Sequence, residues 1–323
     1  MTGPDHLDAD RLSAPGGQPV LVVDAAGWRR PKVPIQAVVI GVDREGLLPA
    51  VAADDFDLLL TIAPDAPHPW VSDPQPERLA DAARANPLAA TIAAEVLRLT
   101  AERPLAEALR IESLAYSALL GGGEFARWRD GARAEASPFP PEPLAIARDG
   151  DRISLTLNDP ANRNAISAPM RDALYEALAN ALDDPSAPDV LLQGAGKCFS
   201  TGGLIAEFGS ARDLAEAHAV RTLHSCARAL DALGGRGTVQ LHGACVGSGI
   251  EIAAAAHRRT AAADAWFQLP EIRMGLIPGA GGTATIARAI GRHRTLWMLL
   301  SAKRIGARRA LEWGLIHAIE DRP

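Results

Sequence analysis

The sequence predicts a layered α/β fold, and three observations lead to that prediction. Strand-like apolar runs alternate with helical patterns through the second half of the 323-residue chain, as they do in βαβ units. Hydrophobic residues make up 48% of the composition, which is enough to fill a large core. The segment 137–143 contains four prolines and therefore predicts a linker, because proline interrupts both helix and sheet. We expect an N-terminal α/β and helical extension before this linker and a core domain over residues 144–323.

Residues 1–75 predict a small N-terminal α/β element. Short apolar runs separated by Gly and Pro are typical of buried strands, and they occur at 20–23, 37–42 and 56–62. The sequence assigns no role to this element.

Residues 76–136 predict a helical region. Leu, Ile and Ala recur at three- and four-residue intervals in the segments 76–102 and 104–129. Each segment begins with a proline, which suits the first turn of a helix. We therefore predict a pair of long helices.

The region after the linker predicts alternating strands and helices. Two apolar runs, 144–146 and 153–157, flank Asp149-Gly150-Asp151 and predict a β-hairpin. Helical patterns follow at 167–182, 214–233, 250–256 and 283–290, and strand patterns at 190–192, 238–241 and 260–263. This alternation predicts layered sheets with surrounding helices.

Composition argues against several classes of function. The net charge of −6 and the scattered Lys and Arg residues give little support to a nucleic-acid partner. Three cysteines without C-x-x-C spacing argue against a disulfide framework or a metal site, and favour a cytoplasmic location. The N-terminus lacks the layout of a secretory signal, and no apolar run has the roughly 20 residues of a membrane helix.

Two glutamates, Glu251 and Glu271, stand in apolar, glycine-rich segments. Burying an unpaired carboxylate is costly, so two of them in such surroundings require an explanation. Paired carboxylates in separate environments commonly supply an acid and a base at neutral pH. This pattern indicates an enzyme.

Three glycine-rich loops, 194–203, 242–249 and 275–283, accompany these glutamates. Glycine allows backbone N–H groups to face a ligand. The second and third loops lead into predicted helices, where free N–H groups point outward. Two such donors are able to bind one carbonyl oxygen.

Taken in chain order, the motifs of residues 144–319 resemble the crotonase superfamily, particularly its enoyl-CoA hydratases. They are Asn158-Asp159-Pro160, Arg163-Asn164-Ala165, Gly196-Lys197-Cys198-Phe199-Ser200-Thr201-Gly202-Gly203, Gly247-Ser248-Gly249-Ile250-Glu251, Leu269-Pro270-Glu271 and Gly279-Ala280-Gly281-Gly282-Thr283.

This resemblance implies a ββα superhelix that hydrates a 2-enoyl-CoA to a 3-hydroxyacyl-CoA. It implies catalysis by Glu251 and Glu271, an oxyanion hole formed by the N–H groups of Thr201 and Ser248, and water positioning by Gly279. We expect Glu251 to activate the water and Glu271 to supply the α-proton. Substrate-binding positions implied by the motifs are Arg163, Asn164, Ala165, Gly202, Gly203 and Ile205. Coenzyme A enters as part of the substrate, without a separate cofactor, and the resemblance implies a homotrimer or hexamer.

Two departures from the family pattern leave other functions open. Leu204 replaces an aspartate that is common after the first glycine loop. The segment 76–133 is similar to the helices that family members carry after the equivalent of residue 319, which suggests a circular permutation. Contacts between 105–120 and 283–316 support that hypothesis, whereas a separately folded N-terminal domain contradicts it. Alternatives are a crotonase-type isomerase or C–C bond hydrolase, and a non-catalytic acyl-CoA-binding subunit.

Overall fold

The computed structural model describes residues 6–132 and 136–322, so the predictions that fall on residues 1–5, 133–135 and 323 lie outside the described residues. After α1 (His6–Arg11), four parallel strands pair in the order β1-β2-β3-β4. They are β1 (Val20–Asp24), β2 (Val38–Asp43), β3 (Leu58–Thr61) and β4 (Trp70–Ser72). The sequence predicts the first three. It does not predict β4, whose three residues are too few to show an alternating pattern.

Within the described residues 76–132, the helical region contains four helices where the sequence predicts two. The predicted helix 76–102 divides into α2 (Pro76–Ala85) and α3 (Pro87–Thr100), because Pro87 cannot continue a helix but suits the first turn of a new one. The predicted helix 104–129 divides into α4 (Leu105–Leu120) and α5 (Gly123–Gly131) at Gly121 and Gly122. Glycine lowers the helical stability at that point.

The region after the linker forms two sheets. The larger has the order β13-β10-β8-β7-β6-β5, and its described strands pair in parallel except for the predicted hairpin of β5 and β6. These are β5 (Leu144–Asp149), β6 (Arg152–Leu157), β7 (Asp189–Gly194), β8 (Gly237–Leu241), β10 (Arg258–Ala261) and β13 (Ala318–Ile319). The smaller sheet joins β12 (Ile305–Gly306), β11 (Trp266–Gln268) and β9 (Ala244–Val246).

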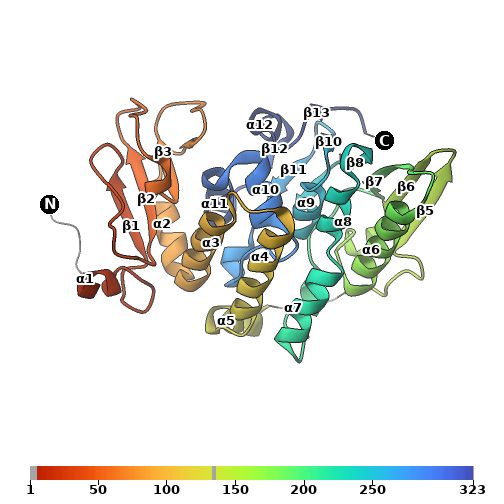
Figure 1. Cartoon of the computed structure of the whole chain (residues 1–323), viewed down its shortest axis with the longest axis horizontal. Coiled ribbons are helices and arrows are strands. Elements are labelled where there is room, and N and C mark those ends of the chain that lie inside the picture. The colour runs from red at the N-terminus through yellow and green to blue at the C-terminus, as the bar shows by residue number, and fades with distance from the viewer. Residues whose placement is uncertain (1–5, 133–135, 323) are drawn as a thin grey trace.

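Helices surround these sheets (Figure 1). The predicted helix 214–233 divides into two, because the Ser225 side chain accepts a hydrogen bond from the N–H of Arg228 and starts a new helix there. The helices of this region are α6 (Ala168–Asp183), α7 (Leu214–Leu223), α8 (Cys226–Ala232), α9 (Ser248–Ala253), α10 (Gly282–Ile290), α11 (Arg292–Ser301) and α12 (Ala307–Trp313).

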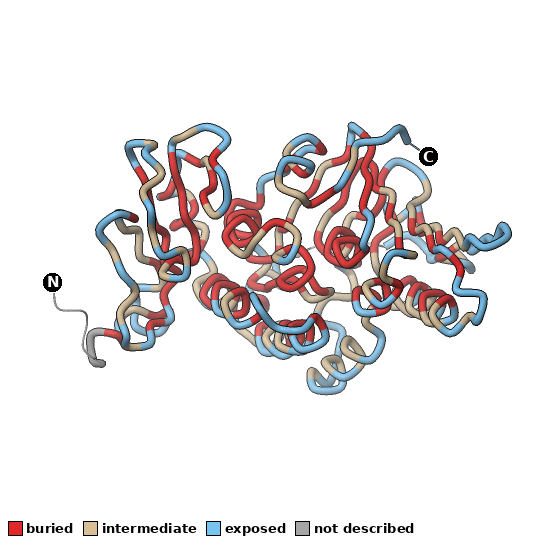
Figure 2. The backbone as a smooth tube through the Cα atoms, turned by 45° about the horizontal axis from the view of Figure 1, so that its top comes forward, coloured by how far each residue is buried: buried red, intermediate tan, exposed pale blue. Residues whose placement is uncertain are grey.

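The extension and the core pack as one body. Helix α4 lies against α7 and α10, and α2 and α3 lie against α11. One buried cluster includes Val38 of the N-terminal sheet, Leu97 of α3 and Met298 of α11, so buried backbone runs across the molecule (Figure 2). A separately folded N-terminal domain without such contacts is therefore excluded.

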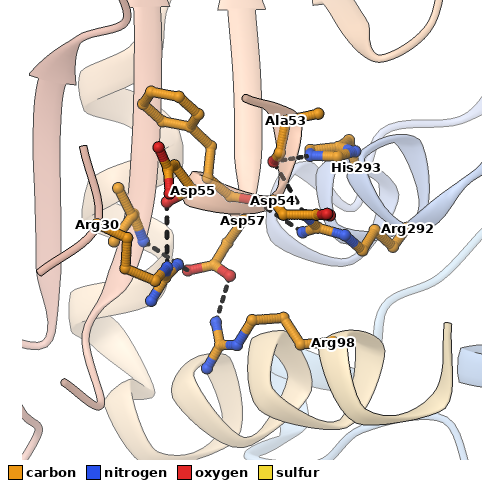
Figure 3. A network of polar contacts seen from close by, with 10 residues as sticks. Arg30, Ala53, Asp54, Asp55, Asp57, Arg98, Arg292 and His293 are labelled. Carbon is orange, nitrogen blue, oxygen red and sulfur yellow. Dashed lines mark hydrogen bonds and ion pairs between the residues drawn. The ribbon is translucent and has the colours of Figure 1, made fainter. Parts of the chain in front are cut away.

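Polar contacts also hold the N-terminal sheet in place (Figure 3). Asp57 is 2% exposed and forms ion pairs with Arg30 and with Arg98 of α3. Arg292 of α11 donates hydrogen bonds to the carbonyl oxygens of Phe56, at 2.7 Å, and Ala53, at 2.9 Å. Because these groups are largely buried, losing one partner leaves a charge or a polar group unpaired.

Candidate active site

A cleft with a volume of about 620 Å³ lies where the helical region meets the core. Its lining is mostly apolar and comes from residues of α4, α7 and the glycine loops. The loops bring eight predicted site residues to this cleft: Thr201, Gly202, Gly203, Ile205, Ser248, Glu251, Glu271 and Gly279. Residues that are far apart in the sequence thus share one cavity.

The two glutamates face the same point beside Gly247. A Cβ atom at Gly247 would lie 2.8 Å from Oε1 of Glu271 and 3.8 Å from Oε1 of Glu251. Gly247 also has a φ of +48°, a conformation that side chains disfavour. Glycine at this position therefore allows both the turn and the close approach of the carboxylates.

The two carboxylates have different partners. Oε2 of Glu251 accepts hydrogen bonds from the N–H of Ala280, at 2.7 Å, and of Gly282, at 3.2 Å. Burial raises the pKa of Glu251 to about 7, and these hydrogen bonds oppose the rise. Oε2 of Glu271 is buried without a hydrogen-bond partner among the described residues. Burial, followed by the charge of Glu251, raises the pKa of Glu271 well above its usual range. Burial thus raises the pKa of both carboxyl groups, and the hydrogen bonds from Ala280 and Gly282 favour the ionised form of Glu251.

The structure corrects one predicted oxyanion donor. The Thr201 N–H donates to the carbonyl oxygen of Arg163 at 3.2 Å, so it is not free to bind a substrate. Within the described residues, the N–H groups of Gly203 and Ser248 have no hydrogen-bond acceptor. A Cβ atom at Gly203 would lie 3.8 Å from Oγ of Ser248, so the two residues are neighbours. The available pair of donors is Gly203 and Ser248.

The segment 163–165 does not line the cleft, contrary to the sequence prediction. Asn164 is fully buried, and its Nδ2 donates to the carbonyl oxygens of Ala195, at 2.8 Å, and Cys198, at 3.0 Å. Arg163 contributes its carbonyl to the Thr201 N–H, and Ala165 is buried. This segment therefore supports the first glycine loop from behind.

Leu204, which replaces the aspartate expected from the family pattern, lines the cleft and is 8% exposed. The loop around it is held by Glu207, whose Oε2 accepts a hydrogen bond from the N–H of Ala168 at 2.9 Å. Ala168 begins α6, where a carboxylate is favoured by the helix dipole. The Glu207 carboxylate thus attaches this loop to α6.

Sequence reasoning missed the contribution of α4 and α7 to the cleft. Glu112 and Tyr116 of α4 and Arg221 of α7 line it. A Cβ atom at Gly279 would lie 2.8 Å from the Tyr116 ring, and the Arg221 guanidinium lies 4.9 Å from the centre of that ring. Glu112 stands within the segment whose pattern resembles the family's final helices, but no local signal indicates Tyr116 or Arg221.

The described part of the chain shows no group of three His, Cys, Asp or Glu residues suited to a metal ion. None of its described helices combines the length and apolar character needed to cross a membrane.

The core of the chain is similar in sequence to curated proteins of known name. The chain is 32% identical over 181 residues to a probable enoyl-CoA hydratase of Bacillus subtilis (strain 168). This aligned region covers 54% of this chain and 67% of that protein. It is also 32% identical over 177 residues to the fatty acid oxidation complex subunit alpha of Shewanella sp. (strain W3-18-1). That aligned region covers 53% of this chain and 25% of the subunit. The chain thus spans about a quarter of the length of the Shewanella relative.

Solved structures show the same fold. An enoyl-CoA hydratase from Thermoplasma volcanium GSS1 matches with a TM-score of 0.50 and 28% identity, over 56% of this chain and 72% of that one. An enoyl-CoA hydratase/carnithine racemase from Magnetospirillum magneticum matches with a TM-score of 0.51 and 27% identity, over 56% and 69%. The enoyl-CoA hydratase/isomerase family model matches residues 151–322, more than half of the chain. This chain therefore belongs to the enoyl-CoA hydratase/isomerase family and has a crotonase fold.

Proposed function

We propose that this protein adds water across the double bond of a 2-enoyl-CoA to form a 3-hydroxyacyl-CoA. One observation carries the proposal: Glu251 and Glu271 face one point in an apolar cleft, yet only Glu251 accepts hydrogen bonds from backbone N–H groups among the described residues. Such different environments suit a base and an acid acting on one substrate. Coenzyme A enters as part of the substrate, and no separate cofactor is required.

The first element of the mechanism is polarisation of the thioester carbonyl. We place its oxygen between the N–H groups of Gly203 and Ser248, with Gly203 replacing the Thr201 of the sequence prediction. Two preorganised donors stabilise the enolate charge that develops on this oxygen during the addition. The β-carbon becomes electrophilic as a result.

The second element is proton transfer by the two carboxylates. Ionised Glu251 removes a proton from water while the water oxygen forms a bond to the β-carbon. The electron pair of the double bond moves toward the carbonyl, and protonated Glu271 then gives its proton to the α-carbon. Gly279 lines the same cleft and is our proposed backbone contact for the water. Return of a proton from Glu251 to Glu271 restores the starting state.

A panel of enoyl-CoA thioesters of increasing chain length tests this proposal. Purified protein is expected to consume the conjugated double bond, which a spectrophotometric assay measures directly, and to form a 3-hydroxyacyl-CoA. Glu271→Gln is expected to abolish most of this turnover because glutamine cannot donate the α-proton. Identical turnover by the wild type and Glu271→Gln would show that Glu271 is not the acid.

Other reactions in the same family give different products in this assay. Double-bond migration without added water would identify an isomerase, and cleavage of a cyclic ketone would identify a C–C bond hydrolase. Binding of coenzyme A without turnover of any thioester would favour a non-catalytic acyl-CoA-binding subunit. The buried Glu251 and Glu271 favour catalysis, since a binding protein has no need of two costly carboxylates.

The rate of hydration is expected to depend on pH in a bell-shaped manner. The value of kcat/KM should rise as the pH increases through about 7, because Glu251 must lose its proton to act as a base. It should fall at higher pH as Glu271, whose pKa is raised further, loses the proton that it donates. Initial rates measured from pH 5 to 10 check this, and a flat profile would contradict the acid and base roles. The two apparent pKa values of this profile belong to the coupled pair Glu251 and Glu271 and not to either residue alone.

The helical region is also part of the proposed enzyme. We propose that residues 76–132 occupy the place that the family's final helices take in other members, as a circular permutation would produce. Packing of α4 against α10 and over the cleft supports this arrangement. A homo-oligomeric state and a cytoplasmic location stay predictions from the sequence.

A further inference from the structure

Two carboxylates from distant parts of the chain bind the N-terminus of α10. Glu251 accepts the N–H groups of Ala280 and Gly282, as described above. Glu112 of α4 accepts the intervening N–H of Gly281, at 2.7 Å, and that of Thr283, also at 2.7 Å. Successive N–H groups of this loop therefore alternate between the two glutamates.

Glu112 is buried, and its carboxylate accepts hydrogen bonds on both oxygens. Its side chain is 1% exposed, and Oε2 also accepts a hydrogen bond from Oγ1 of Thr283 at 2.6 Å. Helix α10 has nine residues, and the positive end of its dipole favours negative charge at this point. Burial and the charge of Glu251 nevertheless raise the pKa of Glu112 to about 8. Two buried carboxylates, Glu112 and Glu251, therefore bind one loop despite the free-energy cost of burying each charge.

We propose that Glu112 is a positioning residue for hydration, acting on Glu251 and Gly279 through the loop 279–283. This inference rests on the proposed function. Glu112 binds the N–H of Gly281 through Oε1 and that of Thr283 through Oε2, so Glu112→Gln keeps an acceptor for only one of these buried N–H groups, and the loop must shift to satisfy the other. The N–H groups of Ala280 and Gly282, which hold Glu251, alternate with these two N–H groups along the loop and would shift as well.

The alternative is that Glu112 only stabilises a helix, and the chain offers a matched control for this. Glu124 of α5 is 5% exposed, and its carboxylate accepts the N–H groups of Leu88, at 2.8 Å, and Ala89, at 2.9 Å, at the start of α3. Glu124 does not line the cleft. Replacing either glutamate by glutamine therefore disturbs a buried helix N-terminus, but only Glu112 lies beside Glu251.

The first experiment compares the steady-state kinetics of Glu112→Gln and Glu124→Gln. Glu112→Gln is expected to lower kcat on the order of 10- to 100-fold, because small displacements of catalytic groups have effects of this size. Its KM should stay near the wild-type value, since the N–H groups of Gly203 and Ser248 are untouched. Glu124→Gln should lower the melting temperature without this loss of kcat. Equal kcat values for the two variants at equal loss of stability would overturn the proposal.

A second experiment does not depend on turnover. Hydrogen–deuterium exchange of the peptide covering 279–290 should be faster in Glu112→Gln than in the wild type, and unchanged in Glu124→Gln. Unchanged exchange in both variants would overturn the positioning role of Glu112, whether or not the wild type hydrates a thioester. Absence of turnover in the wild type would separately refute the proposed function. Should Glu112→Gln fail to fold, Thr283→Val removes one of the three donors to Glu112 and is expected to produce the same changes at smaller size.

Discussion

Glu251→Gln is expected to lower kcat for hydration by about 10²- to 10⁴-fold, the usual contribution of a general base. Glutamine retains one oxygen that accepts hydrogen bonds from the N–H groups of Ala280 and Gly282, so the loop is expected to keep its conformation. It cannot take a proton from water near neutral pH. The loss should therefore appear in kcat, while the affinity for a non-reacting acyl-CoA, measured by isothermal titration calorimetry, stays close to that of the wild type.

An exposed glutamate provides the control for this variant. Glu95 of α3 lies on the surface and outside the cleft, so Glu95→Gln should keep the wild-type rate and melting temperature. A wild-type rate in Glu251→Gln would show that Glu251 is not the base. Loss of both rate and acyl-CoA affinity would instead indicate a distorted site.

Ser248→Pro is expected to lower kcat on the order of 100-fold or more, because it removes one donor of the proposed oxyanion hole. A backbone N–H cannot be removed by changing an ordinary side chain, but proline lacks it. Ser248 is the first residue of α9, a position at which helices accept proline readily. The helix should therefore form, and circular dichroism checks this while the thioester assay measures the rate.

Ser248→Ala separates the backbone from the side chain. It keeps the N–H and removes Oγ, which is buried without a partner among the described residues. Its rate should stay near that of the wild type. Equal losses in the alanine and proline variants would assign the effect to the hydroxyl, and a full rate in Ser248→Pro would exclude this N–H as a donor.

The sequence predicted the two glutamates and most of the glycine loops, because their motifs are local and their order is specific. It failed where a role depends on a distant partner. Thr201 has the spacing of a donor, but the fold places the Arg163 carbonyl against its N–H. Glu112 lies 169 residues before Gly281, to which it accepts a hydrogen bond, and no local pattern indicates that pairing.

The secondary-structure elements also divide into those that the local sequence predicts and those that it does not. The β5–β6 hairpin and the strands β7, β8 and β10 follow from apolar runs and turn residues, which are properties of short segments. The sequence does not predict the two- and three-residue strands β9, β11, β12 and β13, which are too short to show a pattern. Long predicted helices were divided where a proline, a pair of glycines or a capping serine lies inside a helical pattern. In these segments the local capping and breaking residues outweighed the apolar periodicity.

The sequence by itself determined the family, the layered α/β core and the pair of carboxylates, since apolar periodicity and ordered glycine motifs are written in consecutive residues. Only the tertiary structure decided which N–H groups are free, how the surroundings of Glu251 and Glu271 differ, and that α4 lines the cleft. The reason is physical. Burial and hydrogen bonding shift the pKa of a carboxylate, and both depend on groups that only folding brings within a few ångströms of it.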